Sequence, residues 1–242
     1  MIRFSSIFSM ILMVVLFSAC DTLVREVGNG NMITKEIEVD DFKEIIVSGN
    51  FEIMLIAGDK AGVSLTADEN LHEFIEISTN GDRLVIETLA NLDSDDGLSL
   101  YITYTQLTAI EIGGAATLES EETIDGEYLN ISMSGAGALD LSLNLNALKL
   151  SVSGAGSVEL SGRADEQNIS MSGAGGLDAY ELESKICKVQ ISGVGSANIN
   201  VTEKLDASVS GVGGISYIGN PEEVISDVSG LGSISKSGRD NK

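Results

Sequence analysis

A four-residue phrase, Ser-Gly-x-Gly, occurs six times in the second half of the chain. The first glycines of successive phrases are 19, 19, 20, 18 and 19 residues apart. A fixed period of about 20 residues is typical of stacked structural units, each too small to bury its own apolar face. We interpret the repeated residues as structural; they are Ser134, Gly135, Gly137, Ser153, Gly154, Gly156, Ser172, Gly173, Gly175, Ser192, Gly193, Gly195, Ser210, Gly211, Gly213, Ser229, Gly230 and Gly232.

Apolar residues recur at fixed positions around each phrase. Two residues before the first glycine stand Met133, Val152, Met171, Ile191, Val209 and Val228. Four residues after it stand Leu139, Val158, Leu177, Ala197, Ile215 and Ile234. Apolar residues at every second position predict strands with one buried face, and the glycines predict a bend between two strands.

No helical pattern lies between the units, which excludes leucine-rich repeats and βαβ units. The sequence therefore predicts an all-β fold, a single-stranded β-helix or solenoid with coils of about 19 residues. We expect right-handed coils, because parallel crossover connections have that hand. The six serines should stack along one corner and hydrogen-bond from coil to coil.

The composition suits a narrow solenoid and restricts the partners. The chain has 27 glycines, one proline and no tryptophan, so small aliphatic side chains must fill the interior. The net charge of −23 argues against nucleic acid, whose phosphates require clustered Lys and Arg. Neutral glycans, basic surfaces, cations and other proteins remain as partners. Self-association through a solenoid face is compatible with the sequence.

Residues 1–19 resemble a lipoprotein signal peptide. The apolar run Ile7–Phe17 is too short to span a membrane, and Ser18-Ala19 precedes Cys20. Cys20 is the expected lipidation site, although Phe17 departs from the usual aliphatic residue. The alternative is an ordinary secretory signal with an incidental cysteine. We expect an outer-membrane lipoprotein of the cell envelope, exposed at the surface, while Asp21 is compatible with either retention or export.

The rest of the chain divides without a clear linker. Residues 20–34 are expected to form the lipidated cysteine and a polar tether, and residues 35–236 a single β-helix domain. Within that domain, residues 35–106 should be irregular early coils and residues 107–236 regular coils. Residues 237–242 form a polar tail. A short helix or turn at residues 68–74 and a hairpin turn at residues 80–82 are also predicted.

Signals for metal, cofactor or catalytic chemistry are weak. His72 is the only histidine, so a zinc site lacks ligands. The acidic loop at residues 93–97 lacks the frame of an EF-hand, and a solvated turn is the simpler interpretation. Cys187 shares its column with Leu129, Leu148 and Leu205, which favours a buried, unreactive thiol. We expect no cofactor, no metal and no catalytic residue.

One polar column carries the candidate binding face. The position five residues after the first glycine reads Asp140, Glu159, Asp178, Asn198, Ser216 and Ser235. Calcium-binding nonapeptide repeats also place an aspartate after glycines, but their period of nine is half the period seen here. We therefore expect Asp140, Glu159, Asp178 and Asn198 to form an outward column that contacts a partner. A glycan hydrolase using these carboxylates is an open alternative.

Three segments carry a family resemblance. They are Val47-Ser48-Gly49-Asn50-Phe51-Glu52-Ile53, Ala67-Asp68-Glu69-Asn70-Leu71 and Asn80-Gly81-Asp82-Arg83-Leu84-Val85-Ile86. Together with the later Ser-Gly-Ala-Gly and Ser-Gly-Val-Gly phrases, they resemble the putative auto-transporter adhesin, head GIN domain family. The resemblance covers nearly all of residues 35–236. It implies a secreted or lipid-anchored β-helical protein of a kind common in Bacteroidetes, with no catalytic residues to carry over.

Function follows as an expectation. The chain should be a non-enzymatic binding or structural module of the cell envelope, and a surface adhesin is the leading hypothesis. A periplasmic envelope-stress or assembly scaffold that binds another protein is the alternative, and a glycan-active hydrolase is the second alternative.

Overall fold

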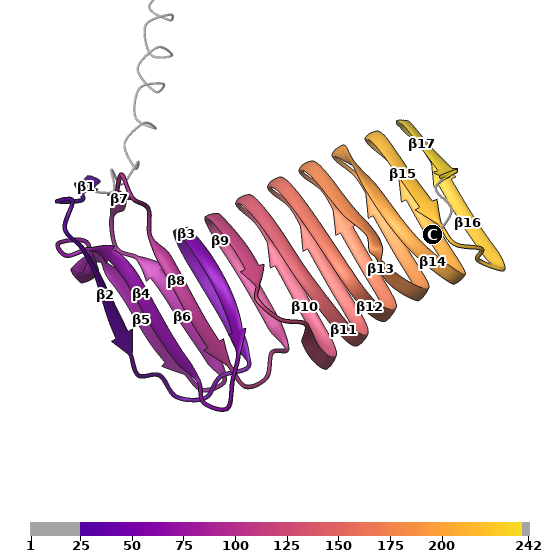
Figure 1. Cartoon of the computed structure of the whole chain (residues 1–242). Coiled ribbons are helices and arrows are strands. Elements are labelled where there is room, and N and C mark those ends of the chain that lie inside the picture. The colour runs from indigo at the N-terminus through magenta and orange to yellow at the C-terminus, as the bar shows by residue number, and fades with distance from the viewer. Residues whose placement is uncertain (1–24, 239–242) are drawn as a thin grey trace, which may run out of the picture.

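A computed structural model describes residues 25–238 as a rod of stacked β-coils (Figure 1). The predicted all-β solenoid is confirmed, with about seven turns and coils of about 19 residues. The regular coils are formed by β9 (Ala109–Ser120), β10 (Ile124–Met133), β11 (Ala136–Val152), β12 (Ala155–Met171), β13 (Ala174–Ile191), β14 (Val194–Val209), β15 (Val212–Ile218), β16 (Glu223–Val228) and β17 (Leu231–Lys236). Neighbouring coils pair in parallel.

The predicted apolar columns fill the interior of the rod. Leu150 pairs with Ile131 on one side and Ile169 on the other, and all three are fully buried. Burial of one such side chain contributes about 1.5–3 kcal/mol. Because each coil buries its apolar face only against its neighbours, the alternating pattern fixes both the strands and their register.

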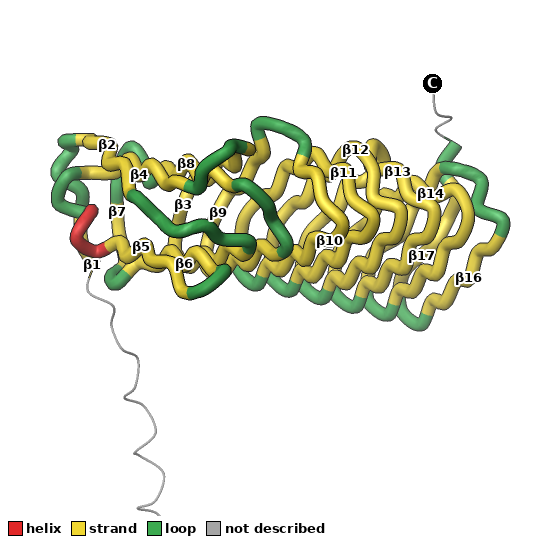
Figure 2. Tube along the Cα trace, turned by 90° about the horizontal axis from the view of Figure 1, so that it is seen from below, coloured by secondary structure: helices red, strands yellow, loops and turns green. Residues whose placement is uncertain are grey.

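The glycine phrases form the bends, which line up along one edge of the rod (Figure 2). A Cβ atom on Gly154 would lie 1.6 Å from the carbonyl oxygen of Gly135, so only hydrogen fits between these coils. The N–H of Ala155 donates to that same carbonyl at 3.0 Å.

The six serines of the phrase hydrogen-bond from coil to coil mainly through their backbone N–H groups. The backbone N–H of Ser153 donates to the Met133 carbonyl at 2.9 Å, and the other five serines repeat this bond. Among these six serines, which all lie in the described residues, only Ser134 also donates through its hydroxyl, at 3.4 Å to the Ile112 carbonyl. The other five serines of the phrase are exposed.

The first half of the domain, which we call the cap, continues the stack of coils and adds strands outside the repeat. Here β3 (Glu44–Ala57) is the first coil, with β9 on one side and with β6 and β8 on the other. The cap elements are β2 (Met32–Ile37), β4 (Gly62–Asp68), the 3₁₀ helix η1 (His72–Phe74), β5 (Ile75–Asn80), β6 (Arg83–Thr88), β7 (Asn91–Asp93) and β8 (Ser99–Tyr104). They close one end of the rod (Figure 2).

Antiparallel pairing distinguishes the cap from the coils. Strand β4 pairs antiparallel with β2 and β8, and β5 pairs antiparallel with β6. The predicted hairpin turn joins β5 and β6 through Gly81, whose φ of +61° lies in the region that favours glycine. The predicted helix or turn at residues 68–74 is η1. Buried Phe42, Leu71 and Leu84 cover the apolar columns at this end.

The chain is already structured where a tether was expected. Residues 1–19 and Cys20 lie outside the described residues, but β1 (Arg25–Val27) pairs in parallel with β7. The buried carboxylate of Asp68 accepts bonds from the Gly30 N–H and the Ser94 hydroxyl, both at 2.6 Å. Residues 25–34 are therefore part of the cap, held by partners that lie far away in the sequence. No helix in the described part has the length and apolar run needed to cross a bilayer.

The opposite end of the rod is less covered. All six residues of β16 are exposed, and the Leu231 side chain is 81% exposed. The sequence predicts decay of the columns here, at Ser226 and Lys236. Val224 and Val228 nevertheless keep their places in register with Leu205 and Val209. The terminal coil thus retains strand geometry without a covering element among the described residues.

Gln167 is a polar defect in the interior, and its replacement by Leu should stabilise the fold. The residue is 3% exposed, its Oε1 has no partner, and its Nε2 makes one long bond of 3.5 Å to the Leu182 carbonyl. Leu148 occupies the paired position in the preceding coil. We expect Gln167→Leu to raise the free energy of unfolding by about 1–2 kcal/mol, because a buried unpaired acceptor is removed. Thermal unfolding measures this, and an unchanged or lower midpoint would contradict it.

Candidate functional site

Two polar columns run side by side over one outer face of the rod. In β11, Ala138 and Asp140 point outward while Leu139 and Leu141 are buried. Register then aligns Ala138 with Thr117 and Ser157, and Asp140 with Glu119 and Glu159. Because side chains alternate along a strand, the same two positions of every coil face solvent together.

These columns line a shallow groove, which we call the outer groove, with a volume of about 450 Å³. Its floor column carries small side chains, and its carboxylate column carries four acids and one amide. The floor column is Thr117, Ala138, Ser157, Gly176 and Ser196; the carboxylate column is Glu119, Asp140, Glu159, Asp178 and Asn198. Small residues on the floor leave the hollow that the longer acids border.

All four predicted binding-face residues lie in this groove. The structure brings Asp140, Glu159, Asp178 and Asn198 into adjacent coils, at a strand spacing of about 4.8 Å. Sequence reasoning missed Glu119 and the floor column. The signal was available, since each floor residue stands two positions before its acid, but Glu119 follows an irregular phrase.

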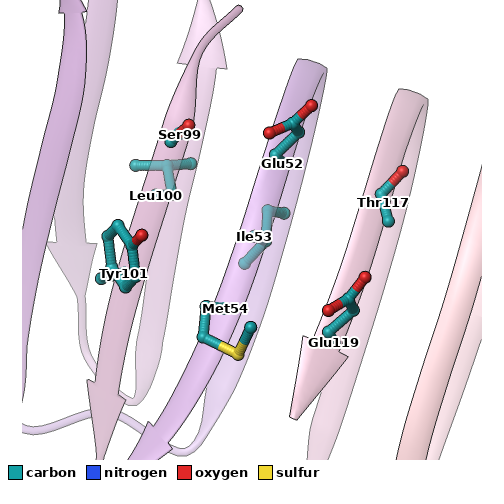
Figure 3. A pocket seen from close by; sticks show the side chains of 8 residues that line it. All are labelled: Glu52, Ile53, Met54, Ser99, Leu100, Tyr101, Thr117 and Glu119. Carbon is teal, nitrogen blue, oxygen red and sulfur yellow. The ribbon is translucent and has the colours of Figure 1, made fainter. Parts of the chain in front are cut away.

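A second hollow continues the groove onto the cap (Figure 3). This cap pocket has a volume of about 310 Å³ and shares Thr117 and Glu119 with the outer groove. Strand β3 contributes Glu52 and Met54, and β8 contributes Ser99 and Tyr101. Glu52 and Met54 stand three and five residues after Gly49, in register with Thr117 and Glu119. Ser99 and Tyr101 come from a strand without the glycine phrase, so the repeat pattern does not mark them.

The groove and the pocket are acidic and contain no counter-charge. No Lys or Arg lines either hollow. The Asp178 carboxylate accepts one bond of 3.3 Å from the Tyr180 N–H, and the Tyr180 hydroxyl donates to Ser216 at 2.8 Å. Across residues 25–238, no group of three or more His, Cys, Asp or Glu side chains is arranged to hold a metal ion. The face therefore presents hydrogen-bond acceptors and hydroxyls to solvent.

His72 and the acidic loop at residues 93–97 make contacts that stabilise the cap. His72 lies within 3.2 Å of the Ile33 carbonyl through its Nε2 atom. In the acidic loop, Ser94 bonds to Asp68 and Asp93 forms an ion pair with Arg25. These contacts hold the N-terminal segment on the cap.

Cys187 should not react in the folded protein. The side chain is fully buried, and burial raises the pKa of its thiol to about 12. Because the thiolate is the reactive form, we expect no labelling by a maleimide at pH 8 until the chain is unfolded in denaturant. Mass spectrometry before and after unfolding measures this, and rapid labelling of the native protein would refute the expectation.

Comparisons with known proteins agree with this architecture. The family model described as putative auto-transporter adhesin, head GIN domain, matches residues 41–221. A crystal structure titled as a putative adhesin from Bacteroides fragilis has a TM-score of 0.84 at 24% identity, covering 88% of this chain and 100% of that one. No curated protein matches.

Two further crystal structures have the same fold at lower similarity. A putative adhesin from Parabacteroides merdae has a TM-score of 0.67 at 24% identity, over 88% of this chain and 99% of that one. A protein titled as a putative lipid binding protein from Parabacteroides distasonis has a TM-score of 0.68 at 24% identity, with the same coverage. At this identity, the likeness supports the fold alone.

Proposed function

Because the chain belongs to the putative auto-transporter adhesin, head GIN domain family, we propose that it is a cell-envelope lipoprotein that binds an extended glycan without catalysing a reaction. The observation that carries this proposal is the outer groove, in which floor and carboxylate columns stay in register over successive coils. A ligand with repeated hydroxyl groups meets the same pair of side chains at every coil.

The chemistry of the groove suits a glycan without acidic groups. Carboxylates accept hydrogen bonds from sugar hydroxyls, and bonds to charged acceptors contribute more than neutral ones. Ser157 and Ser196 add hydroxyls that both donate and accept. Anionic glycans and phosphates are disfavoured, because the lining carries only negative charge.

Exposure of the acids supports binding rather than hydrolysis. A glycosidase keeps one carboxyl group protonated in an apolar setting while the second stays ionised. Asp140, Glu159 and Asp178 are all exposed and occupy equivalent positions, so nothing separates an acid from a base.

Binding through the groove is tested with a triple variant. We expect Asp140→Asn, Glu159→Gln and Asp178→Asn together to weaken binding to immobilised neutral or amine-bearing polysaccharides by tenfold or more, since loss of about 1.4 kcal/mol already gives tenfold. The matched control is Glu111→Gln, Glu166→Gln and Glu203→Gln, which changes three exposed acids outside the groove. Equal binding by both triple variants, or no binding by the parent protein, would refute the proposal.

The lipoprotein part of the proposal rests on Cys20, which lies outside the described residues. We expect protease added to intact cells to digest the tagged protein, and Cys20→Ala to release it from the membrane fraction. Digestion only after the envelope is opened would contradict surface display and would favour the periplasmic scaffold. Retention of Cys20→Ala in the membrane would contradict lipid anchoring.

A further inference from the structure

We propose that the cap pocket binds the protonated amine of an amino sugar and thereby anchors one end of the glycan in the outer groove. This inference rests on the proposed function and specifies its ligand. It starts from the cavity of about 310 Å³ that joins the cap to the first regular coils (Figure 3).

The pocket is a grid of six outward side chains on three strands. Register sets Ser99, Glu52 and Thr117 in one row across β8, β3 and β9, and Tyr101, Met54 and Glu119 in the next row. The intervening Ile53 and Leu100 are buried, which fixes the floor to the core. Neighbours within a row are about 4.8 Å apart and the rows about 6.8 Å apart, so Glu52 and Glu119 are diagonal neighbours at about 8 Å.

Two carboxylates and one aromatic ring surround the space above Met54. Glu52 and Glu119 are exposed, and no described residue forms an ion pair or hydrogen bond with either carboxylate. The Tyr101 side chain is 48% exposed and pairs directly with Met54. A cation placed here is attracted by both carboxylates and by the face of a nearby ring, while Met54 supplies a polarisable contact.

The lining favours a cation over other groups. Unpaired carboxylates with no Lys or Arg in the lining repel phosphates and uronic acids, and a neutral sugar offers them no opposite charge. An ammonium group satisfies both acids with its N–H donors. Tyr101 offers its ring to the apolar face of the sugar that carries the amine.

Continuity with the outer groove identifies the carrier of the amine. Thr117 and Glu119 line both hollows, so a chain that leaves the pocket lies directly over Ala138 and Asp140. An extended peptide fits this path less well. Its same-face side chains repeat every 6.6–6.8 Å or so, whereas equivalent residues of neighbouring coils are about 4.8 Å apart. The pocket therefore acts as the end subsite for an amine-bearing glycan.

The Met54 methyl group reports binding directly. We expect D-glucosamine, added to the full domain at low ionic strength, to shift the Met54 methyl NMR signal, which Met54→Leu assigns. N-acetylglucosamine and glucuronate, without a free amine, should shift it little. Glu52→Gln and Glu119→Gln should each weaken glucosamine binding about fivefold to tenfold, and Tyr101→Ala about threefold to tenfold.

Matched controls separate the pocket from general surface effects. Glu111 lies on the same strand as Glu119 but outside the pocket, and Tyr128 is 45% exposed, close to the value for Tyr101. Glu111→Gln and Tyr128→Ala should leave the glucosamine titration unchanged. The inference would be overturned if glucosamine did not shift the Met54 methyl signal, if N-acetylglucosamine shifted it equally, or if control and pocket variants had equal effects.

The two proposals fail in different ways. If glucosamine ignores the pocket while polysaccharide binding still depends on Asp140, Glu159 and Asp178, the inference falls and the groove proposal stands. If glucosamine shifts Met54 as expected while no polysaccharide depends on the three groove acids, the pocket stands alone and the extended site falls.

Discussion

Gly154→Ala is expected to lower the free energy of unfolding by about 3 kcal/mol, at the upper end of the range for overpacked sites. The added Cβ would lie 1.6 Å from the Gly135 carbonyl oxygen and 2.6 Å from its carbon. Both are backbone atoms held by the hydrogen bond from Ala155, so no side chain can turn away to relieve the contact. The coils must separate, and for a domain of this size the unfolding midpoint should fall by about 6–12 °C.

A second glycine in the neighbouring coil provides the control. Gly176 lies in the floor column, where Ala138 and Ser157 already carry side chains, and a Cβ there would meet only the Ser196 hydroxyl oxygen at 4.0 Å. Gly176→Ala should change the free energy of unfolding by less than about 0.5 kcal/mol. Similar midpoints for the two alanine variants would show that close backbone approach is not what the glycine phrase provides.

Asp68→Ala is expected to detach the N-terminal segment from the cap at a local cost of about 2–4 kcal/mol. The substitution leaves the Gly30 N–H and the Ser94 hydroxyl without their shared carboxylate. The Gly30 amide should then exchange with solvent about thirtyfold to several hundredfold faster, because each 1.4 kcal/mol is tenfold in the opening equilibrium. Trypsin should also cleave after Arg25 sooner.

Asp95→Ala is the matched control for this prediction. Asp95 belongs to the same loop as Ser94 but is exposed, so its removal breaks no contact with the N-terminal segment. Unchanged exchange at Gly30 in Asp68→Ala, or equal acceleration in Asp95→Ala, would mean that the β1–β7 pairing holds the segment without the buried carboxylate.

The regular coils could be predicted because every constraint in them is local and repeated. Ile131, Leu150 and Ile169 stand at fixed distances from their glycines, so one alternating pattern gives strand, bend and register together. The carboxylate column also stands at a fixed distance from the glycines, so the repeat predicts Asp140, Glu159 and Asp178 without knowledge of the groove.

The cap could not be predicted in the same way, because its partners are distant in the chain. Strand β3 has the Ser-Gly phrase of a coil, and β9 is its neighbour on one side. Between these two strands in the sequence, residues 58–108 leave the stack and supply the strands on the other side of β3. Local patterns give the strands but not this order. Tyr101 and Met54 are neighbours only through that pairing, so the sequence pattern does not predict the cap pocket. The pattern also does not predict that Asp68 holds the segment expected to be a tether.

The groove is built from one pair of residues per coil, so its length depends on the number of coils. Each coil adds one floor residue and one polar residue, so under the proposed function the number of coils, rather than any single side chain, would set how much ligand is contacted. Gain or loss of one repeat by slippage in the gene would lengthen or shorten the site by one step of about 4.8 Å and leave the remaining steps intact. If the groove binds a glycan as proposed, the number of coils would set its specificity for ligand size, and evolution can change that number without redesigning the interior.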